Sequence, residues 1–288
     1  MLKNDKFGFK RYWLLVALKE IPRQPEIFAN KNLNDARKAF LAGKNQLVAI
    51  KNWLELGEII AAVPPRKHQL TEIGQLMLER DPQGQEAWTW WLFHLHLCAN
   101  TGACPYSTFF TAYELEDAHW LEFDEVVKKL HSRAVEAGED VSDTTVGNYF
   151  EGVDRSFRPG SPFYGLGLVE RRAIDGEPGK ERIRRCQVAP NDIAVTYGTL
   201  LFQHSMFPDQ TTIETRVLLE KGLARCLALR EHEFRESLAR IHQHADLSKF
   251  LQYRRLVNLD SVQFLKSGEE ALYAVRRHGY ISEEVQWQ

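Results

Sequence analysis

Two short amphipathic helices, joined by a tight turn, are the feature that most restricts how this chain folds. Residues 30–43 carry apolar side chains at helical spacing, and a second segment with the same spacing begins at residues 44–45. The inward-facing positions of the two segments are Leu33, Ala36, Phe40, Leu47, Ile50 and Leu54. Gly43 separates the segments, and short helices joined by a glycine-containing turn are typical of a helix-turn-helix. The sequence therefore predicts this motif near the N-terminal end of the chain.

A basic hairpin follows the second helix of this motif. Residues 58–63 form a short apolar run that suits a strand, and the prolines of residues 64–68 interrupt it as a turn. Residues 69–78 begin extended and then become helical, with Thr71 as the expected N-cap. Helix, turn, helix, strand, basic turn, strand and helix is the order of a winged helix. We therefore expect an N-terminal winged helix-turn-helix.

The whole chain is expected to be mainly α with short β-hairpins, an α+β fold. It has 288 residues, of which 44% are hydrophobic, and this is enough for two ordinary domains. Charge, Gly138 and a high Ser and Thr content indicate exposed chain at residues 135–143. We therefore predict an N-terminal domain of residues 1–138, with the winged helix and a helical extension. A mixed α/β domain of residues 139–288 follows it.

The C-terminal half repeats part of the N-terminal order. Residues 167–174 and 181–189 suit two strands, and the Asp-Gly and Pro-Gly pairs between them suit a hairpin turn. Residues 190–204 then suit a helix. Strand, basic turn, strand and helix repeat the order of residues 56–78. The repetition raises the hypothesis of a degenerate second winged helix.

Charge is unevenly distributed, although the formal net charge is only −2. Residues 1–51 contain eleven Lys and Arg against four Asp and Glu, and residues 155–185 contain eight against four. Residues 114–143 contain ten acidic against three basic residues. This asymmetry suits a protein with one anion-facing surface and another that rejects anions or docks a basic partner. The alternative is that each charge run is a solvated face without a partner.

Polar and basic side chains lie where a winged helix would contact double-stranded DNA. At the start and open face of the second helix, the expected DNA-binding residues are Lys44, Asn45, Gln46 and Lys51. At the hairpin turn they are Arg66, Lys67 and His68. Lys would contact phosphate, while Asn or Gln could reach a base edge. The alternative is a winged helix used only for protein contacts.

One segment carries the residue types that a metal-dependent nuclease uses. Residues 150–160 offer Glu151, Asp154 and Arg155 as catalytic candidates. Carboxylates there could hold Mg²⁺ or Mn²⁺ while an arginine steadies a phosphate. An interdomain salt-bridge cluster explains the same residues equally well.

Other metal-binding patterns are weaker. Asp209, Glu214 and Arg216 form a second nuclease candidate, but they are spaced too closely along the chain to be persuasive. His94 and His96 stand two residues apart, about 200° around a helix, so they cannot bind one metal ion from a helix. The sequence therefore does not identify the metal.

Five short motifs are spread along most of residues 7–277. The first is LAGKNQLVAIKNW, which contains Gly43, Lys44, Asn45 and Trp53. The others are LTEIGQLML, WWLFHLHL, SPFYGLGLVERR and VAPNDIAVTYGTLL. Together they resemble a bacterial family of uncharacterised domains found beside sulfur-transfer genes, which includes the SspB-type component of DNA phosphorothioation systems. That family usually opens with a stretch containing His-Glu-Thr-Phe, which the corresponding FGFKRYWLL lacks, so no role of that stretch is carried over.

The resemblance implies a DNA-acting component of a bacterial modification and defence system, which nicks the duplex so that sulfur can enter the backbone. It also implies partnership with a cysteine desulfurase, an ATP-pyrophosphatase-like sulfur transferase and an ATPase. Two alternatives stay open: a non-catalytic DNA-binding adaptor, and a protein-interaction module in which acidic residues 114–143 dock a basic partner. The sequence has no run of apolar residues long enough for a membrane span and no secretory signal. We therefore expect a cytoplasmic protein without membrane contact.

Overall fold

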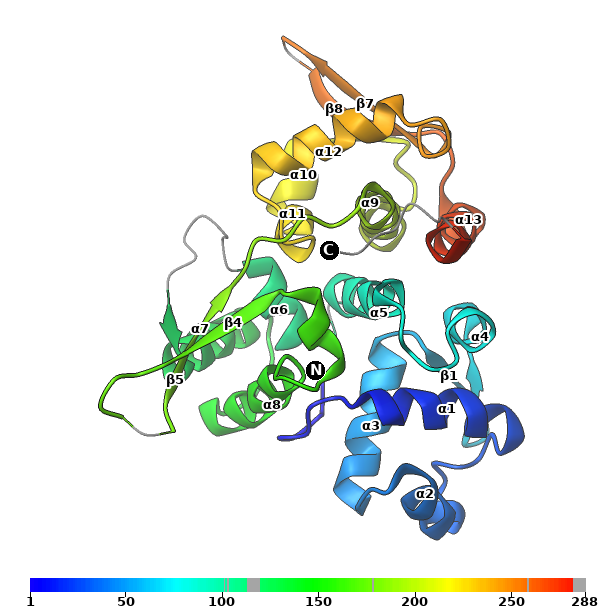
Figure 1. Ribbon diagram of the computed structural model, residues 1–288, viewed down its shortest axis with the longest axis vertical. Helices are drawn as coiled ribbons and strands as arrows, with labels where there is room; N and C mark the ends of the chain where they lie inside the picture. Colours follow the sequence, from blue (N-terminus) through cyan, green and yellow to red (C-terminus); the bar gives the residue numbers. More distant parts are fainter. Residues whose placement is uncertain (101, 103, 113–119, 178, 258, 282–288) are drawn as a thin grey trace. The chain divides into compact units, whose positions relative to one another are not determined.

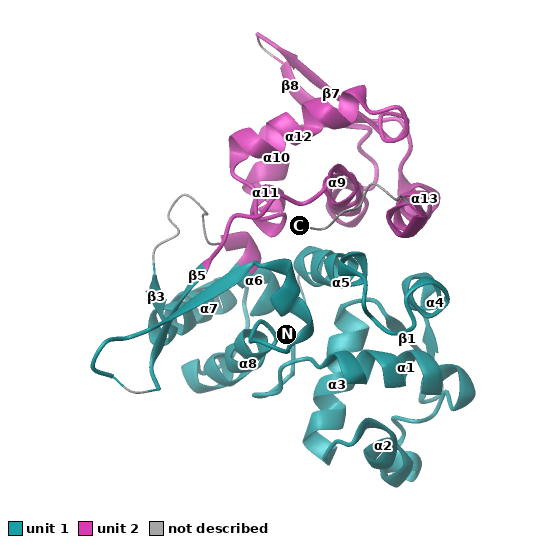
Figure 2. Ribbon diagram, viewed as in Figure 1, with its two compact units in different colours: residues 1–109, 120–184 teal, residues 110–119, 185–288 magenta. Residues whose placement is uncertain are grey.

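The computed structural model describes every residue except 101, 103, 113–119, 178, 258 and 282–288 (Figure 1). The described residues form helices and short β-hairpins, which confirms the expected α+β fold class. They divide into two compact units (Figure 2). Unit 1 comprises the described residues of 1–109 and 120–184, and unit 2 those of 110–119 and 185–288. None of the described helices is long and apolar enough to cross a membrane.

The first part of unit 1 contains the helices and the hairpin predicted for the N-terminal region. Its elements are α1 (Arg11–Arg23), α2 (Leu33–Phe40), α3 (Lys44–Leu56), β1 (Ile60–Val63), β2 (Lys67–Leu70) and α4 (Glu72–Arg80). α2 ends where Leu41 takes a left-handed conformation, with a φ of 47°. Gly43 precedes α3, and its N–H donates to the side-chain oxygen of Gln46 at 2.8 Å. Thr71 is the N-cap of α4, as predicted, because its hydroxyl oxygen accepts from the Gly74 N–H at 3.2 Å.

The β1–β2 hairpin is tied to the preceding helices through its second strand. The two strands are antiparallel and pair from Ile60 opposite Leu70 to Val63 opposite Lys67. The backbone N–H of the residue after Lys67 donates to the carbonyl oxygen of Pro25 at 2.8 Å. Pro25 lies between α1 and α2, so the connection between these helices runs beside the hairpin.

α5 (Ala87–Ala99) forms the apolar centre of unit 1. Every residue of this helix after Ala87 is buried. The Phe93 ring meets Phe9 edge-on, with centroids 4.9 Å apart, and meets Phe163 at 5.5 Å. Gly57 lies against the same ring, and a Cβ added there would stand 2.0 Å from a Phe93 carbon. A glycine therefore follows α3 because close packing against α5 leaves no room for a side chain.

The second part of unit 1 contains a three-stranded sheet with the order β3-β5-β4. Its elements are β3 (Leu121–Glu122), α7 (Phe123–Glu136), α8 (Asp143–Arg155), the short 3₁₀ helix η3 (Pro162–Leu166), β4 (Val169–Ala173) and β5 (Glu181–Arg185). α6 (Tyr106–Ala112) precedes them and begins in unit 1. α7 and α8 pack against each other across the predicted boundary at residue 138. The division into compact units falls after residue 184, so the first helix and hairpin of the predicted second domain belong to unit 1.

Unit 2 is built on α9 (Asp192–Met206), which packs against three other helices of the unit. The other elements are β6 (Thr212–Glu214), α10 (Thr215–Glu220), α11 (Leu223–Cys226), α12 (Glu231–Gln243), β7 (Leu251–Leu256), β8 (Leu259–Phe264) and α13 (Gly268–Ile281). Asn191 caps α9 by accepting from the Ala194 N–H at 2.8 Å. The three strands form a second sheet with the order β6-β8-β7. The β7–β8 hairpin extends beyond the helices of its unit (Figure 2).

The two three-stranded sheets are built in the same chain order. In each sheet, a short strand (β3 or β6) comes first in the chain, helices follow it, and a two-stranded hairpin comes last. The second strand of the hairpin (β5 or β8) is the central strand of the sheet. The hairpin predicted within residues 167–189 is present as β4 and β5, and the helix predicted after it is α9. α9 lies in unit 2 because the chain passes into that unit after residue 184. The order strand, turn, strand and helix is thus present as predicted, and the degenerate second winged helix stays a hypothesis.

Candidate nucleic-acid interface

The first turn of α3 presents two of the predicted DNA-binding residues to solvent. Lys44 and Asn45 are exposed, and in the part of the chain that the structure describes their side chains have no hydrogen bond or ion pair. Gln46 is half-buried, and its carboxamide oxygen is engaged as a cap by the Gly43 N–H. The unbonded N–H groups of a first helical turn also favour an anion. The start of α3 thus offers a cation, a carboxamide and a helix N-terminus to one ligand.

Two further cations lie on α2, just before the turn. Arg37 and Lys38 are exposed and form no ion pair with a described carboxylate. They were not predicted as DNA contacts, although their places outside the apolar stripe of α2 could have identified them. We call Arg37, Lys38 and Lys44 the basic surface of the helix-turn-helix. Its charge is not neutralised by carboxylates within the described chain, so it is available to an anionic partner.

The hairpin turn presents Arg66 and Lys67 to solvent, but it does not present His68. Both cations are exposed, whereas His68 is only 7% exposed. Its Nε2 lies 3.0 Å from the Glu55 carboxylate, and its ring meets Phe28 edge-on. The prediction that His68 contacts DNA is therefore corrected. Side chains alternate along β2, so the one that follows the exposed Lys67 points inward.

The His68–Glu55 contact joins the hairpin to α3. Burial by itself raises the pKa of the Glu55 carboxyl, but the hydrogen bond with His68 and the positive charge of Lys51 outweigh this effect and lower the pKa. Glu55 is therefore ionised near neutral pH. Lys51 is half-buried and stands one turn before Glu55 on the helix, so this carboxylate partly offsets its charge. Lys51 is consequently a weaker DNA-contact candidate than Lys44.

Asp154, one of the three predicted catalytic candidates, lies on α8 and is held by ion pairs to two arginines. Its side chain is 5% exposed. One carboxylate oxygen accepts from Arg171 at 2.6 Å and the other accepts from Arg158 at 3.0 Å. Arg171 also donates to the backbone carbonyls of Asp154 and Phe157. These bonds join β4 to α8, and they favour the salt-bridge explanation of this segment.

Glu151 and Arg155, the other two candidates, are paired with each other along α8. Glu151 is also 3.4 Å from the Lys6 ammonium. Among the described residues, no group of three or more His, Cys, Asp and Glu side chains is placed to hold a metal ion. Both Glu151 and Asp154 are instead bonded to cations, which compete with a metal for the same oxygens. The described residues therefore do not fit the expected Mg²⁺ or Mn²⁺ site.

Of the weaker candidates, Glu214 and Arg216 line one cavity of unit 2, whereas Asp209 is not part of its lining. Asp209 and Glu214 are exposed, and the Arg216 guanidinium pairs with Glu220 at 3.0 Å. His94 is buried in α5, and its Nδ1 lies 2.8 Å from the Tyr106 hydroxyl. These contacts account for the residues as parts of the surface and of the core.

The basic segment 155–185 is largely neutralised by neighbouring carboxylates. Its pairs on the β4–β5 hairpin are Lys180–Glu177, Arg182–Glu122 and Arg184–Glu170. Glu122 belongs to the acidic stretch 114–143, whose first residues, 114–119, lie outside the described part of the chain. Among the described residues, the exposed Arg172 of β4 forms no ion pair, so the β4–β5 hairpin keeps one open positive charge while its other exposed cations are paired. The charge pattern points to the helix-turn-helix as the anion-facing surface.

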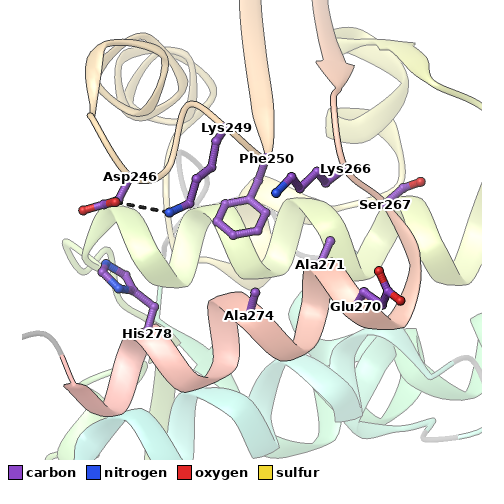
Figure 3. A pocket seen from close by; sticks show the side chains of 9 residues that line it. All are labelled: Asp246, Lys249, Phe250, Lys266, Ser267, Glu270, Ala271, Ala274 and His278. Carbon is purple, nitrogen blue, oxygen red and sulfur yellow. Dashed lines mark hydrogen bonds and ion pairs between the residues drawn. The ribbon is translucent and has the colours of Figure 1, made fainter.

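A cavity of about 570 Å³ lies in unit 2 between α13 and the segment before β7 (Figure 3). Asp246 and Lys249 face each other across its rim at 3.2 Å. The Lys249 and Lys266 ammoniums lie 5.6 and 5.8 Å from the centroid of the Phe250 ring. Glu270 adds a second carboxylate to the lining. Acidic and basic groups balance here, so the cavity does not select an anion.

Two solved structures share this fold. One, described as "Magnesium ion-bound SspB crystal structure", matches 96% of this chain and 86% of its own, with a TM-score of 0.75 and 18% identity. The other, described as "SspB crystal structure", matches 97% and 90%, with a TM-score of 0.75 and 16% identity. These matches confirm that the chain shares its fold with SspB, as the resemblance of the sequence motifs predicted.

A comparison with curated proteins found no significant match. A family model, by contrast, matches residues 3–278, which is nearly the whole chain. The chain therefore belongs to the family described as "Protein of unknown function (DUF4007)".

Proposed function

We propose that this protein is the DNA-binding component of a bacterial DNA phosphorothioation and defence system of the SspB type, acting in the cytoplasm. The observation that carries the proposal is the basic surface of the helix-turn-helix, together with the exposed cations of the β1–β2 turn. These cations stand on elements in the order of a winged helix, and they form no ion pair with a carboxylate among the described residues. The resemblance to SspB supplies the link to phosphorothioation.

In this proposal the N-terminal winged helix contacts double-stranded DNA through α3 and the hairpin turn. Lys44 contacts a phosphate at the start of the helix, and Asn45 reaches a base edge. Arg66 and Lys67 contact the flanking backbone as a wing. Their side chains are exposed, so binding requires no rearrangement of the core.

The finer part of the proposal is that the protein nicks DNA so that sulfur can enter the backbone. It works with the cysteine desulfurase, the ATP-pyrophosphatase-like sulfur transferase and the ATPase implied by the resemblance. The ion pairs of Glu151 and Asp154 favour the alternative of a non-catalytic adaptor, which binds DNA and recruits the sulfur-transfer enzymes. One SspB structure is described as magnesium ion-bound, and this supports a metal-dependent reaction.

DNA binding is tested with a labelled 20-base-pair duplex over a range of salt concentrations. Replacing Lys44 by alanine is expected to weaken binding about fivefold near 0.15 M salt, because one phosphate contact is lost. The slope of log affinity against log salt should fall by about 0.9. Lys128→Ala, an exposed lysine on α7, is the matched control and should bind like the wild type. Equal affinities of the Lys44 and Lys128 variants would contradict the proposed contact.

Nicking is tested by incubating supercoiled plasmid with the protein and either Mg²⁺ or Mn²⁺. Conversion to open circles supports a nickase, whereas plasmid that stays supercoiled with both metals supports the adaptor. Glu151→Gln removes a partly exposed carboxylate and keeps the size of the side chain. If that variant still binds DNA but no longer nicks, Glu151 is catalytic. If nicking is unchanged, the chemistry lies elsewhere.

A further inference from the structure

A second cavity, of about 350 Å³, lies in unit 1 between α3 and α8. We call it the α3–α8 pocket. Its lining residues are Lys3, Asp5, Asn45, Val48, Thr145, Asn148 and Tyr149. It shares Asn45 with the proposed DNA-binding helix, and α8 supplies the opposite wall. This volume lies near the lower end of the range for small-molecule pockets, roughly 300–1,000 Å³.

The walls of the pocket are fixed by the start of the chain, which runs between the two helices. The Lys3 backbone N–H donates to the Asn52 side chain of α3 at 2.5 Å. The fully buried Asn4 side chain donates to the Tyr149 carbonyl of α8 at 3.0 Å. Gly152 allows this approach, because a Cβ there would stand 2.2 Å from the Asn4 nitrogen. The pocket is therefore a built feature of unit 1.

Two carboxamides in the lining have no partner within the described chain. Asn45 is exposed and Asn148 is half-buried, and neither side chain makes a hydrogen bond there. A carboxamide presents a donor and an acceptor side by side, which complements the edge of a nucleobase. The half-buried Tyr149 adds an aromatic ring, on which a base can stack. Lys3 and Asp5 add one cation and one carboxylate, so recognition in this pocket rests on the carboxamides and the aromatic ring and not on net charge.

A concave site of this kind cannot take a base that is still inside a duplex. A paired base is stacked between its neighbours, and only an unpaired or extruded base can enter a pocket. Asn45, which lines the pocket, follows Lys44 in the first turn of α3, where the proposed function places DNA. The bound duplex would therefore bring such a base close to the pocket.

We propose that the α3–α8 pocket holds one unpaired nucleobase of the DNA that α3 contacts, and that Asn148 reads its edge together with Asn45. This inference rests on the proposed DNA binding. It predicts that the protein prefers DNA containing an unpaired base to a fully paired duplex. Asn148 then determines that preference, while Lys44 contributes to both kinds of complex.

The test compares a labelled, fully paired 20-base-pair duplex with four versions that carry a single-nucleotide bulge of A, C, G or T. Wild-type protein should bind at least one bulged duplex about tenfold more tightly, because one bidentate base contact is gained. Asn148→Ala should bind that duplex no better than the paired one, and should keep the wild-type affinity for the paired duplex. Asn148→Leu, which keeps the side-chain size, should behave in the same way.

Asn30→Ala is the matched control, since Asn30 is an exposed asparagine outside the pocket. It should keep the preference, and Lys44→Ala should weaken paired and bulged duplexes by the same factor. Wild-type binding without any preference for a bulge overturns the pocket proposal and leaves the proposed DNA binding intact. A preference that persists in both folded Asn148 variants overturns it as well. Absence of binding to any duplex overturns the proposed function and this inference together.

Discussion

Replacing Asp154 with alanine is expected to lower the free energy of unfolding by about 3–5 kcal/mol, because it breaks a buried ion pair from one side. The Asp154 side chain is 5% exposed and that of its partner Arg171 is 10% exposed. Without the carboxylate, the Arg171 guanidinium keeps its charge in a site with little water. The guanidinium groups of Arg158 and Arg171 then lack the carboxylate that pairs with both of them. Urea unfolding followed by circular dichroism measures the change.

Glu151→Gln is the matched control on the same helix. Its carboxylate is 29% exposed and both of its cationic partners are about half exposed, so its loss should cost less than about 1 kcal/mol. The two variants also separate structure from catalysis. If Asp154→Ala kept the wild-type stability and DNA affinity but lost plasmid nicking, the structural role assigned to Asp154 would be wrong.

Replacing Trp53 with alanine is expected to cost about 3–5 kcal/mol, the range for a large aromatic side chain removed from a core. Trp53 is fully buried on the inner face of α3. Its ring lies 6.0 Å from Phe9 and 5.8 Å from Tyr106 between centroids. Its Nε1–H donates to the Phe7 carbonyl oxygen at 3.1 Å. The change therefore removes the contacts that fix α3 to the centre of unit 1.

Trp53→Phe separates packing from hydrogen bonding. Phenylalanine keeps a ring in the site but leaves the Phe7 carbonyl without its donor, so a smaller loss of about 1–3 kcal/mol is expected. Val48→Ala changes a 51%-exposed position of the same helix and should stay within about 0.5 kcal/mol of the wild type. Thermal unfolding of the three variants provides the comparison. Equal melting temperatures for Trp53→Ala and Val48→Ala would contradict the anchoring role.

The apolar spacing of the N-terminal region was a reliable guide to local structure. It predicted two short helices, the strand–turn–strand that follows and the Thr71 cap, and these are present as α2, α3, β1, β2 and α4. Local signals sufficed because helix periodicity, capping and turn residues act within a few positions of the chain. The same kind of signal identified the hairpin of β4 and β5 and the helix α9.

Which polar residues are available to a ligand was less predictable. His68 follows two exposed cations in the sequence, yet the pleat of β2 turns it into the core against Glu55. Arg182 and Arg184 look like part of a basic surface, but Glu122 and Glu170 neutralise them. The type of each charged residue is known from the sequence, but the residue that pairs with it belongs to another segment of the chain.

The sequence by itself therefore determined the fold class, the order of the N-terminal elements and the family resemblance, because these depend on periodicity and local motifs. Only the tertiary structure decided that Asp154 is buried between Arg158 and Arg171, and that Asn45 shares a pocket with Asn148. The physical reason is the same in both cases. Burial, ion pairing and cavities are made by residues far apart in the chain, and no spacing rule within one segment contains that information.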